Sequence, residues 1–144
     1  MLFSQARKSD VVSTDTATRV ARVDGFVVAT GPARVALLRL GKVTTEGSLL
    51  YWDDLQGFGP DAATIADASV IRAPDDELER RAESGELEIL GKRVLTERGD
   101  ELGAVTDVDF DVETGVVTTL LTRSEAIPGQ RLIGHGRYAV VVSA

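Results

Sequence analysis

The sequence predicts a mainly β protein, built from two tandem small antiparallel β-barrels that are joined by a linker with one short helix. Three observations support this prediction. Short apolar runs that alternate with polar residues recur along the whole chain, as expected of half-buried strands. One helix-like segment interrupts them near the middle of the chain. On either side of that segment the strand and turn patterns follow in the same order, which indicates an internal repeat.

The strands are expected where β-branched and other apolar residues gather between glycines, prolines and polar residues. In the first half these runs fall at residues 11–13, 20–28, 35–40, 48–51 and 62–65, and in the second half at 93–96, 102–112, 116–121, 130–133 and 138–142. The clearest alternation is at 102–112, where Val108 and Phe110 take one parity and Asp107 and Asp109 the other. Val112-Glu113-Thr114-Gly115 then predicts a hairpin turn, because a short polar turn closed by glycine separates two β-rich runs.

A short helix is expected between residues 73 and 85. Pro74 and the acidic residues after it are typical of a helix start, arginines follow in the later turn, and Gly85 ends the segment. Its apolar positions are few, Leu78 and Ala82, so we expect it on the surface or between the modules. The predicted boundaries are a first module at 1–66, a linker at 67–89 and a second module at 90–144.

Composition excludes several classes of function. With 144 residues, 43% hydrophobic and 27% charged, the chain has globular values. The formal net charge of -7 argues against a nucleic-acid surface. The lack of cysteine excludes disulfides, thiolate zinc sites and cysteine nucleophiles. No apolar stretch is long enough for a signal peptide or a spanning helix, so we expect a cytoplasmic protein without membrane insertion.

The internal repeat is weak in identity but consistent in order. A strand followed by Ala29-Thr30-Gly31 parallels a strand followed by Glu113-Thr114-Gly115. The closing strands also correspond, since Gly57-Phe58-Gly59 precedes one and Gly134-His135-Gly136 the other. We therefore expect a duplicated β module whose two copies share one topology.

The second half resembles a known family. The residues that carry the resemblance are 90–96, 99–111 and Glu113-Thr114-Gly115 with the strand after them, and they are similar to the PRC-barrel. This family is named after the cytoplasmic domain of the photosynthetic reaction-centre H subunit and is also found in a ribosome maturation factor. The first half looks like a diverged copy, with residues 52–62 similar to the family's closing acidic turn and final strand. The second half departs there, since Gly134 to Tyr138 lacks the acidic residue. The resemblance implies a small barrel and a non-catalytic role.

An acidic run in the second half is the strongest candidate for a metal site. Asp107, Asp109, Asp111 and Glu113 resemble the start of a calcium loop, but the required glycine and glutamate are replaced by Val112 and Thr118. Aspartates at every second position of a strand are more simply its solvated face, with a weak surface cation site as the alternative. Because like charges repel, a basic group such as Arg123 is expected opposite them.

Catalytic motifs are not found. His135 lies between two glycines, a context for a tight turn rather than for a general base with an orienting carboxylate. The sequence has no G-x-S-x-G elbow, no phosphate-binding loop and no dinucleotide fingerprint. We therefore expect no catalytic, cofactor-binding or metal-binding residues.

The candidate partner-binding residues are Tyr51, Trp52, Asp53 and Asp54, because an aromatic pair beside acidic residues can form a docking hot spot. The alternative is that one of the two rings caps the barrel and the other lies on its rim. The predicted function is a non-catalytic adaptor or assembly factor that binds a protein of basic or mixed charge, or a second copy of itself. Two alternatives are a ribosome-assembly factor that binds a basic ribosomal protein, and an enzyme with a carboxylate site between the barrels.

Overall fold

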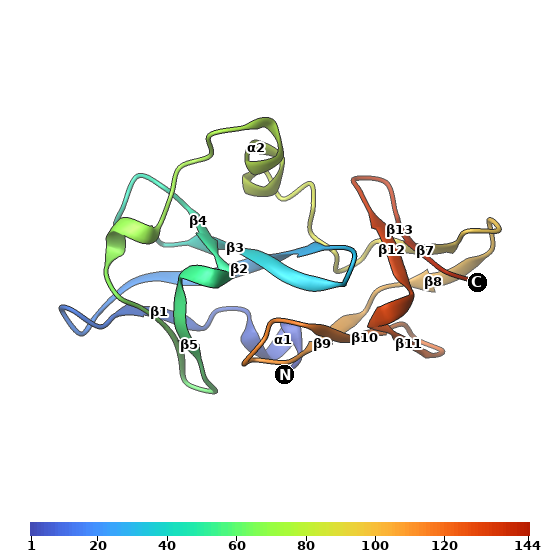
Figure 1. Cartoon of the computed structure of the whole chain (residues 1–144), viewed down its shortest axis with the longest axis horizontal. Coiled ribbons are helices and arrows are strands. Elements are labelled where there is room, and N and C mark those ends of the chain that lie inside the picture. The colour runs from blue at the N-terminus through green and yellow to red at the C-terminus, as the bar shows by residue number, and fades with distance from the viewer.

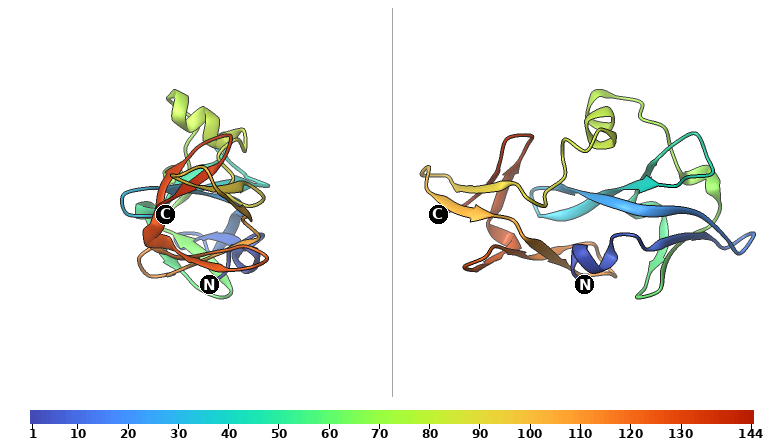
Figure 2. Two further views of the ribbon diagram at one scale, coloured as in Figure 1. Left: turned by 90° about the vertical axis from the view of Figure 1, so that its right-hand side faces the viewer. Right: turned by 180° about the vertical axis from the view of Figure 1, so that it is seen from behind.

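The computed structural model describes all residues, 1–144, and is mainly β (Figure 1). The strands of the first half are β1 (Asp10–Ser13), β2 (Thr18–Ala29), β3 (Arg34–Gly41), β4 (Leu49–Tyr51), β5 (Leu55–Phe58) and β6 (Ala62–Ile65). Those of the second half are β7 (Arg93–Thr96), β8 (Glu101–Ala104), β9 (Asp107–Phe110), β10 (Val117–Leu121), β11 (Ala126–Pro128), β12 (Leu132–His135) and β13 (Val140–Val142). The helices are α1 (Phe3–Ala6) and α2 (Glu77–Glu83), with 3-10 turns η1 (Trp52–Asp54), η2 (Ala68–Val70) and η3 (Gly129–Arg131). The two halves lie end to end along the long axis (Figure 2).

The strands pair in one order in both halves. The first half forms a six-stranded sheet in the order β4-β3-β2-β1-β6-β5, with β1 and β6 parallel and the other neighbours antiparallel. The second half forms two sheets, β11-β10-β9 and β12-β13-β7-β8, in which β7 and β13 are the parallel pair. If β8 and β9 together take the place of β2, each pairing of the first half recurs in the second. This repeated order agrees with the internal repeat in the sequence.

Local irregularities recur at the same places and fix which residues correspond. The β2–β3 register shifts next to the pair Val28 and Val35, and the β9–β10 register shifts next to Phe110 and Val117. The β5–β6 register shifts between Leu55 and Gly57, and the β12–β13 register shifts between Leu132 and Gly134. A β-bulge re-aims the side chains that follow it, so its recurrence places them alike. Counting from these bulges, Phe58 of β5 corresponds to His135 of β12.

The halves meet through equivalent residues. The backbone N–H of Val35 donates to the Gly115 carbonyl oxygen at 2.7 Å, and the N–H of Val117 donates to that of Ala33 at 3.0 Å. Val35 and Val117 hold equivalent positions, as do Ala33 and Gly115. Such reciprocal bonds relate the two halves by an approximate two-fold axis, the arrangement of a symmetric dimer interface.

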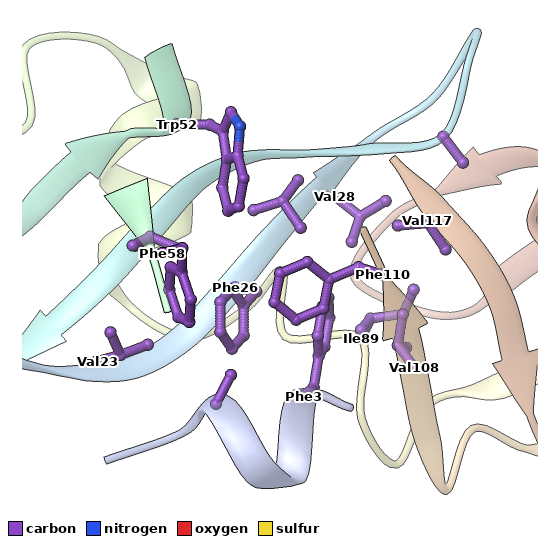
Figure 3. Packing of buried hydrophobic residues seen from close by; sticks show 14 of the residues in the cluster. Phe3, Val23, Phe26, Val28, Trp52, Phe58, Ile89, Val108, Phe110 and Val117 are labelled. Carbon is purple, nitrogen blue, oxygen red and sulfur yellow. The ribbon is translucent and has the colours of Figure 1, made fainter. Parts of the chain in front are cut away.

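One hydrophobic core spans the contact between the halves. Phe3, Phe26 and Phe58 come from the first half and meet Phe110 of the second, and Trp52 stacks on Phe58 with ring centroids 5.9 Å apart (Figure 3). Aromatic rings bury large apolar areas, and offset or edge contacts between them add stability beyond area alone. The packing of each half therefore depends on the other.

The sheets are not the closed barrels that the sequence predicts. The outer edge of β4 pairs with Arg72 of the segment before α2, through backbone bonds between Arg72 and Leu49. The run at 102–112, predicted as one strand, is broken into β8 and β9. The break lies at Val105 and Thr106, whose N–H groups donate to the carbonyls of Lys92 and Leu121. Strands β5 and β11 were not expected, because glycine and proline weaken their local pattern.

The helix prediction is confirmed, and α2 lies over the β2–β3 hairpin (Figure 1). Its N-cap is Asp76, whose side chain accepts from the Glu79 N–H at 2.7 Å, and Gly85 ends the segment at φ +86°. Neither α1 nor α2 is a long apolar helix of the kind that spans a membrane.

Candidate functional site

A pocket of about 400 Å³ lies where α2, the tip of the β2–β3 hairpin and β12 come together, and we call it the α2 pocket. Figure 1 shows α2 above the β2–β3 hairpin, and it shows the β12–β13 hairpin beside the tip of the β2–β3 hairpin. Nine of the twelve lining residues are hydrophobic. The lining consists of Val27, Val28, Ala29, Thr30, Ala36, Leu37, Tyr51, Leu78, Arg81, Ala82, Leu87 and His135. Its volume and apolar lining are typical of ligand-binding pockets, which range over about 300–1,000 Å³.

Apolar packing holds α2 in place as one wall of this pocket. Ala82 and Leu87 pack on Leu37 and Leu49 of the sheet in a small cluster separate from the main core. The helix faces outward with Leu78, which is 60% exposed at the pocket rim. A large apolar side chain left in water beside an apolar pocket is a feature of binding surfaces. The sequence analysis placed Leu78 on the helix but not at a site.

A polar cluster fixes α2 from beneath. The Glu79 side chain is 3% exposed. Its carboxylate accepts hydrogen bonds from the Tyr51 hydroxyl and, at 2.9 Å, from the Asp75 N–H, and it lies 3.3 Å from an Arg72 guanidinium nitrogen. The bond to Glu79 and burial raise the pKa of Tyr51 to about 12, so the phenol stays protonated. A buried carboxylate is tolerated when it is paired and hydrogen-bonded, and these contacts meet that condition.

His135 forms the inner end of the pocket on the side of the second half. It is the last residue of β12 rather than part of the expected turn, which begins one residue later with the Gly136 N–H donating to the Ala139 carbonyl. Its Nδ1 lies 3.3 Å from the Val28 carbonyl oxygen, and its Nε2 is buried without a partner. Because a carbonyl can only accept, Nδ1 carries the proton and Nε2 of the neutral ring is a free acceptor. Burial lowers the pKa of His135, which favours this neutral form.

Positive groups gather beside the pocket. The Arg81 guanidinium donates to the Glu86 carboxylate at 2.8 Å, and the Lys92 ammonium donates to the carbonyls of Glu86 and Glu88 at 2.8 and 2.6 Å. The hydrogen bond from Arg81 and the charges of Arg137 and Lys92 lower the pKa of Glu86, and the second nearby carboxylate, that of Glu88, lies 3.9 Å from the Arg39 guanidinium. Arg137 is exposed and makes no ion pair. The local charge at the pocket is therefore positive, although the whole chain is acidic.

The four predicted partner-binding residues are separated by the structure. Trp52 is only 7% exposed and packs in the core against Phe58 and Phe110, which agrees with the alternative that it caps the fold. Tyr51 lines the α2 pocket. Asp53 and Asp54 are exposed, and Asp53 pairs with Arg34 at 3.2 Å. The four residues therefore differ in exposure, and a partner contact at Tyr51, Trp52, Asp53 and Asp54 stays a prediction.

The aspartates of β9 are engaged by the N-terminal segment rather than by solvent alone. Asp109 accepts from the N-terminal ammonium at 2.9 Å, and Asp107 accepts from the Ser4 N–H at 3.1 Å and from its hydroxyl. The expected basic group opposite them is thus the chain terminus, since Arg123 forms no ion pair. Asp111 accepts from the N–H groups of Glu113 and Thr114 in the hairpin turn. No group of three or more potential metal ligands is brought together in the chain.

A second depression, of about 590 Å³, is lined by β5, β6 and the turn between β9 and β10, and we call it the β5 pocket. It has Phe58 in the place of His135. Only three of its eight lining residues are hydrophobic, and no helix walls it. The lining consists of Gln56, Gly57, Phe58, Gly59, Ala62, Thr64, Val112 and Glu113.

Comparisons with known proteins concern the second half of the chain. No curated protein matches the sequence. The family model described as PRC-barrel domain matches residues 87–142, which cover β7 to β13 together with Leu87 and His135 of the α2 pocket. The match does not extend to the first half, so a second copy of the domain there is not confirmed by the family model. The chain thus contains a PRC-barrel domain at residues 87–142.

Proposed function

We propose that this chain is a non-catalytic adaptor or assembly factor that binds another protein, and that its first half is a diverged copy of the PRC-barrel domain in its second half. The observation that carries the proposal is the α2 pocket with Leu78 on its rim. An apolar pocket beside an exposed apolar side chain offers the buried centre that a protein interface needs. The proposal of a diverged copy is supported by the repeated strand pairings and bulges.

The groups near the pocket support binding rather than chemistry. Glu79 and Tyr51 are occupied with each other and with Arg72 in fixing α2. His135 has its Nδ1 on the Val28 carbonyl, and no nucleophilic side chain lies within hydrogen-bond distance of its buried Nε2. We therefore assign these residues to positioning the pocket walls.

Affinity capture from the native cell extract, with identification of the retained proteins, tests the proposal. The wild-type chain is expected to retain a protein that Leu78→Asp loses, because a charge at the rim opposes burial of apolar surface. Ile133→Asp is the matched control, since Ile133 is 50% exposed but does not line the pocket. If both variants retain the same proteins as the wild type, or if a metabolite screen finds a substrate that the chain converts, the proposal is wrong.

A further inference from the structure

We infer that the α2 pocket binds an acidic peptide segment of its partner, with one large aliphatic or aromatic side chain in the pocket and carboxylates against the cations beside it. This inference rests on the proposed function and specifies the chemistry of the partner at that site. It follows from two features of the pocket: its apolar lining and the local excess of positive charge, to which Arg81 of the lining belongs.

The apolar lining selects the anchoring residue. The strands contribute aliphatic residues such as Val27 and Leu37, and the helix contributes Leu78 and Ala82. A cavity of about 400 Å³ is large enough for a leucine or phenylalanine side chain and is open to solvent at the Leu78 rim, so that the peptide backbone can remain outside. Anchors of this kind supply most of the binding free energy in short peptide interfaces.

His135 closes the inner end of the pocket with its ring. Its Nε2 has no hydrogen-bond partner, but this atom is buried, so a bound peptide contacts the ring rather than this nitrogen. The ring therefore adds to the contact surface of the anchoring side chain and does not require a hydrogen-bond donor in the peptide.

The cations select the flanking charge. Arg81 lines the pocket, Arg137 and Lys92 lie close enough to lower the pKa of Glu86, and Lys92 also acts on His135. The net charge of -7 of the chain favours a basic partner at long range. At contact the near charges dominate, because at physiological ionic strength charges are screened beyond about 8 Å. The pocket is therefore complementary to carboxylates even though the molecule as a whole is acidic.

Selection from a displayed library of random twelve-residue peptides on the immobilised full chain tests this inference. The expected peptides carry a large apolar residue flanked by Asp or Glu. Their affinity is expected to fall about tenfold or more with Leu78→Asp and about three- to tenfold with Arg137→Glu. His135→Phe keeps a ring at the inner end of the pocket, and the affinity is expected to change by less than about twofold.

Arg98→Glu is the matched control for Arg137→Glu. Arg98 is also exposed and free of ion pairs but lies in the turn between β7 and β8, so its reversal should leave peptide affinity within about twofold of the wild type. The inference is overturned if the selected peptides are basic, if Leu78→Asp and Arg137→Glu bind them as the wild type does, or if no peptide is selected. In each of those cases the Leu78-dependent capture experiment still decides separately whether the chain binds a protein at this site.

Discussion

The first half of the chain and the second follow the same order of strand pairings but differ at the positions that matter most for packing and access. Where the first half has Trp52 and Phe58, the second has Gly129 and His135. Trp52 and Phe58 fill the shared core, with their rings stacked. Gly129 instead lies so close to strand β10 that a Cβ at this position would be 2.0 Å from the Val117 carbonyl oxygen. One half therefore supplies most of the aromatic core, and the other leaves a polar ring facing a pocket.

The α2 pocket and the β5 pocket also differ between the halves. Each is lined by a hairpin tip of one half and by the strand after the 3-10 turn of the other half. The α2 pocket has gained a helical wall from the linker, whereas the β5 pocket has not. The helical wall of the α2 pocket thus comes from the segment between the two sets of strands. Substitutions at positions where the halves differ test this comparison.

The largest effect is expected for Trp52→Ala. Removing a buried aromatic side chain costs about 3–5 kcal/mol, because the contacts are lost and the cavity closes only partly. The free energy of unfolding from urea denaturation measures this. Asp54→Ala is the control, since Asp54 is exposed, and a change within about 0.5 kcal/mol is expected there. If both variants are as stable as the wild type, Trp52 is not part of the core.

Gly115→Ala tests how closely the halves approach each other. Gly115 has φ +78°, and an added Cβ would lie 2.8 Å from Cε2 of Trp52. Gly99 has φ +90° and no neighbouring atom within 4 Å of its Cβ position, so Gly99→Ala measures the backbone strain alone. We expect about 1–2 kcal/mol of destabilisation for Gly99→Ala and about 1–2 kcal/mol more for Gly115→Ala. Equal losses in thermal denaturation would show that the contact with Trp52 does not matter.

Tyr51→Phe tests the hydrogen bond between Tyr51 and Glu79 that holds α2 in place. The second half has no such bond, because Pro128 takes the position of Tyr51. The variant removes the hydroxyl that donates to Glu79, and we expect a loss of about 1–2 kcal/mol. The rate of amide hydrogen exchange in α2 should also be higher in Tyr51→Phe than in the wild type. Tyr138→Phe removes an exposed hydroxyl and is expected to change stability by less than about 0.5 kcal/mol. Unchanged exchange in α2 would show that apolar packing alone holds the helix.

The smallest expected effect concerns pH. The pKa of His135 is lowered in the fold by burial, so the unfolded state takes up this proton first as the pH falls below about 6.5. The wild type should therefore lose stability between that pH and the lower pKa of the folded state, and His135→Phe should lose less. Burial raises the pKa of Glu88, which acts in the opposite direction, but it is common to both proteins. Parallel pH profiles of the unfolding free energy would show that His135 titrates alike in both states.

The elements of the fold were largely predictable because their signals are local. Alternation located most strands, and Pro74 with the acidic residues after it and the stop at Gly85 located α2. The break between β8 and β9 was not predictable, since it depends on bonds from Val105 and Thr106 to distant carbonyls. The pairing at the outer edge of β4 was not predictable either. This edge pairs with Arg72, a residue outside the strands, and so does not close a barrel.

The candidate site was only partly predictable. Tyr51 was predicted as a partner-binding aromatic residue, and it does line the α2 pocket. Its hydroxyl, however, donates a hydrogen bond to the buried carboxylate of Glu79. His135 was expected in a turn because of its flanking glycines, yet Gly134 belongs to the β12 bulge and places the ring against the other half. Leu78 and His135 lie far apart in the sequence, and only the packing of α2 and the approximate two-fold axis bring them to one pocket.

The reciprocal bonds between Val35 and Gly115 and between Val117 and Ala33 also bear on stoichiometry. In a true homodimer each surface exists twice, so a binding pocket has two copies and the assembly can bridge two identical partners. Here one continuous chain supplies both sides of the axis, and the two sides carry different pockets. Under the proposed function, each chain therefore offers one α2 pocket and holds one partner segment there.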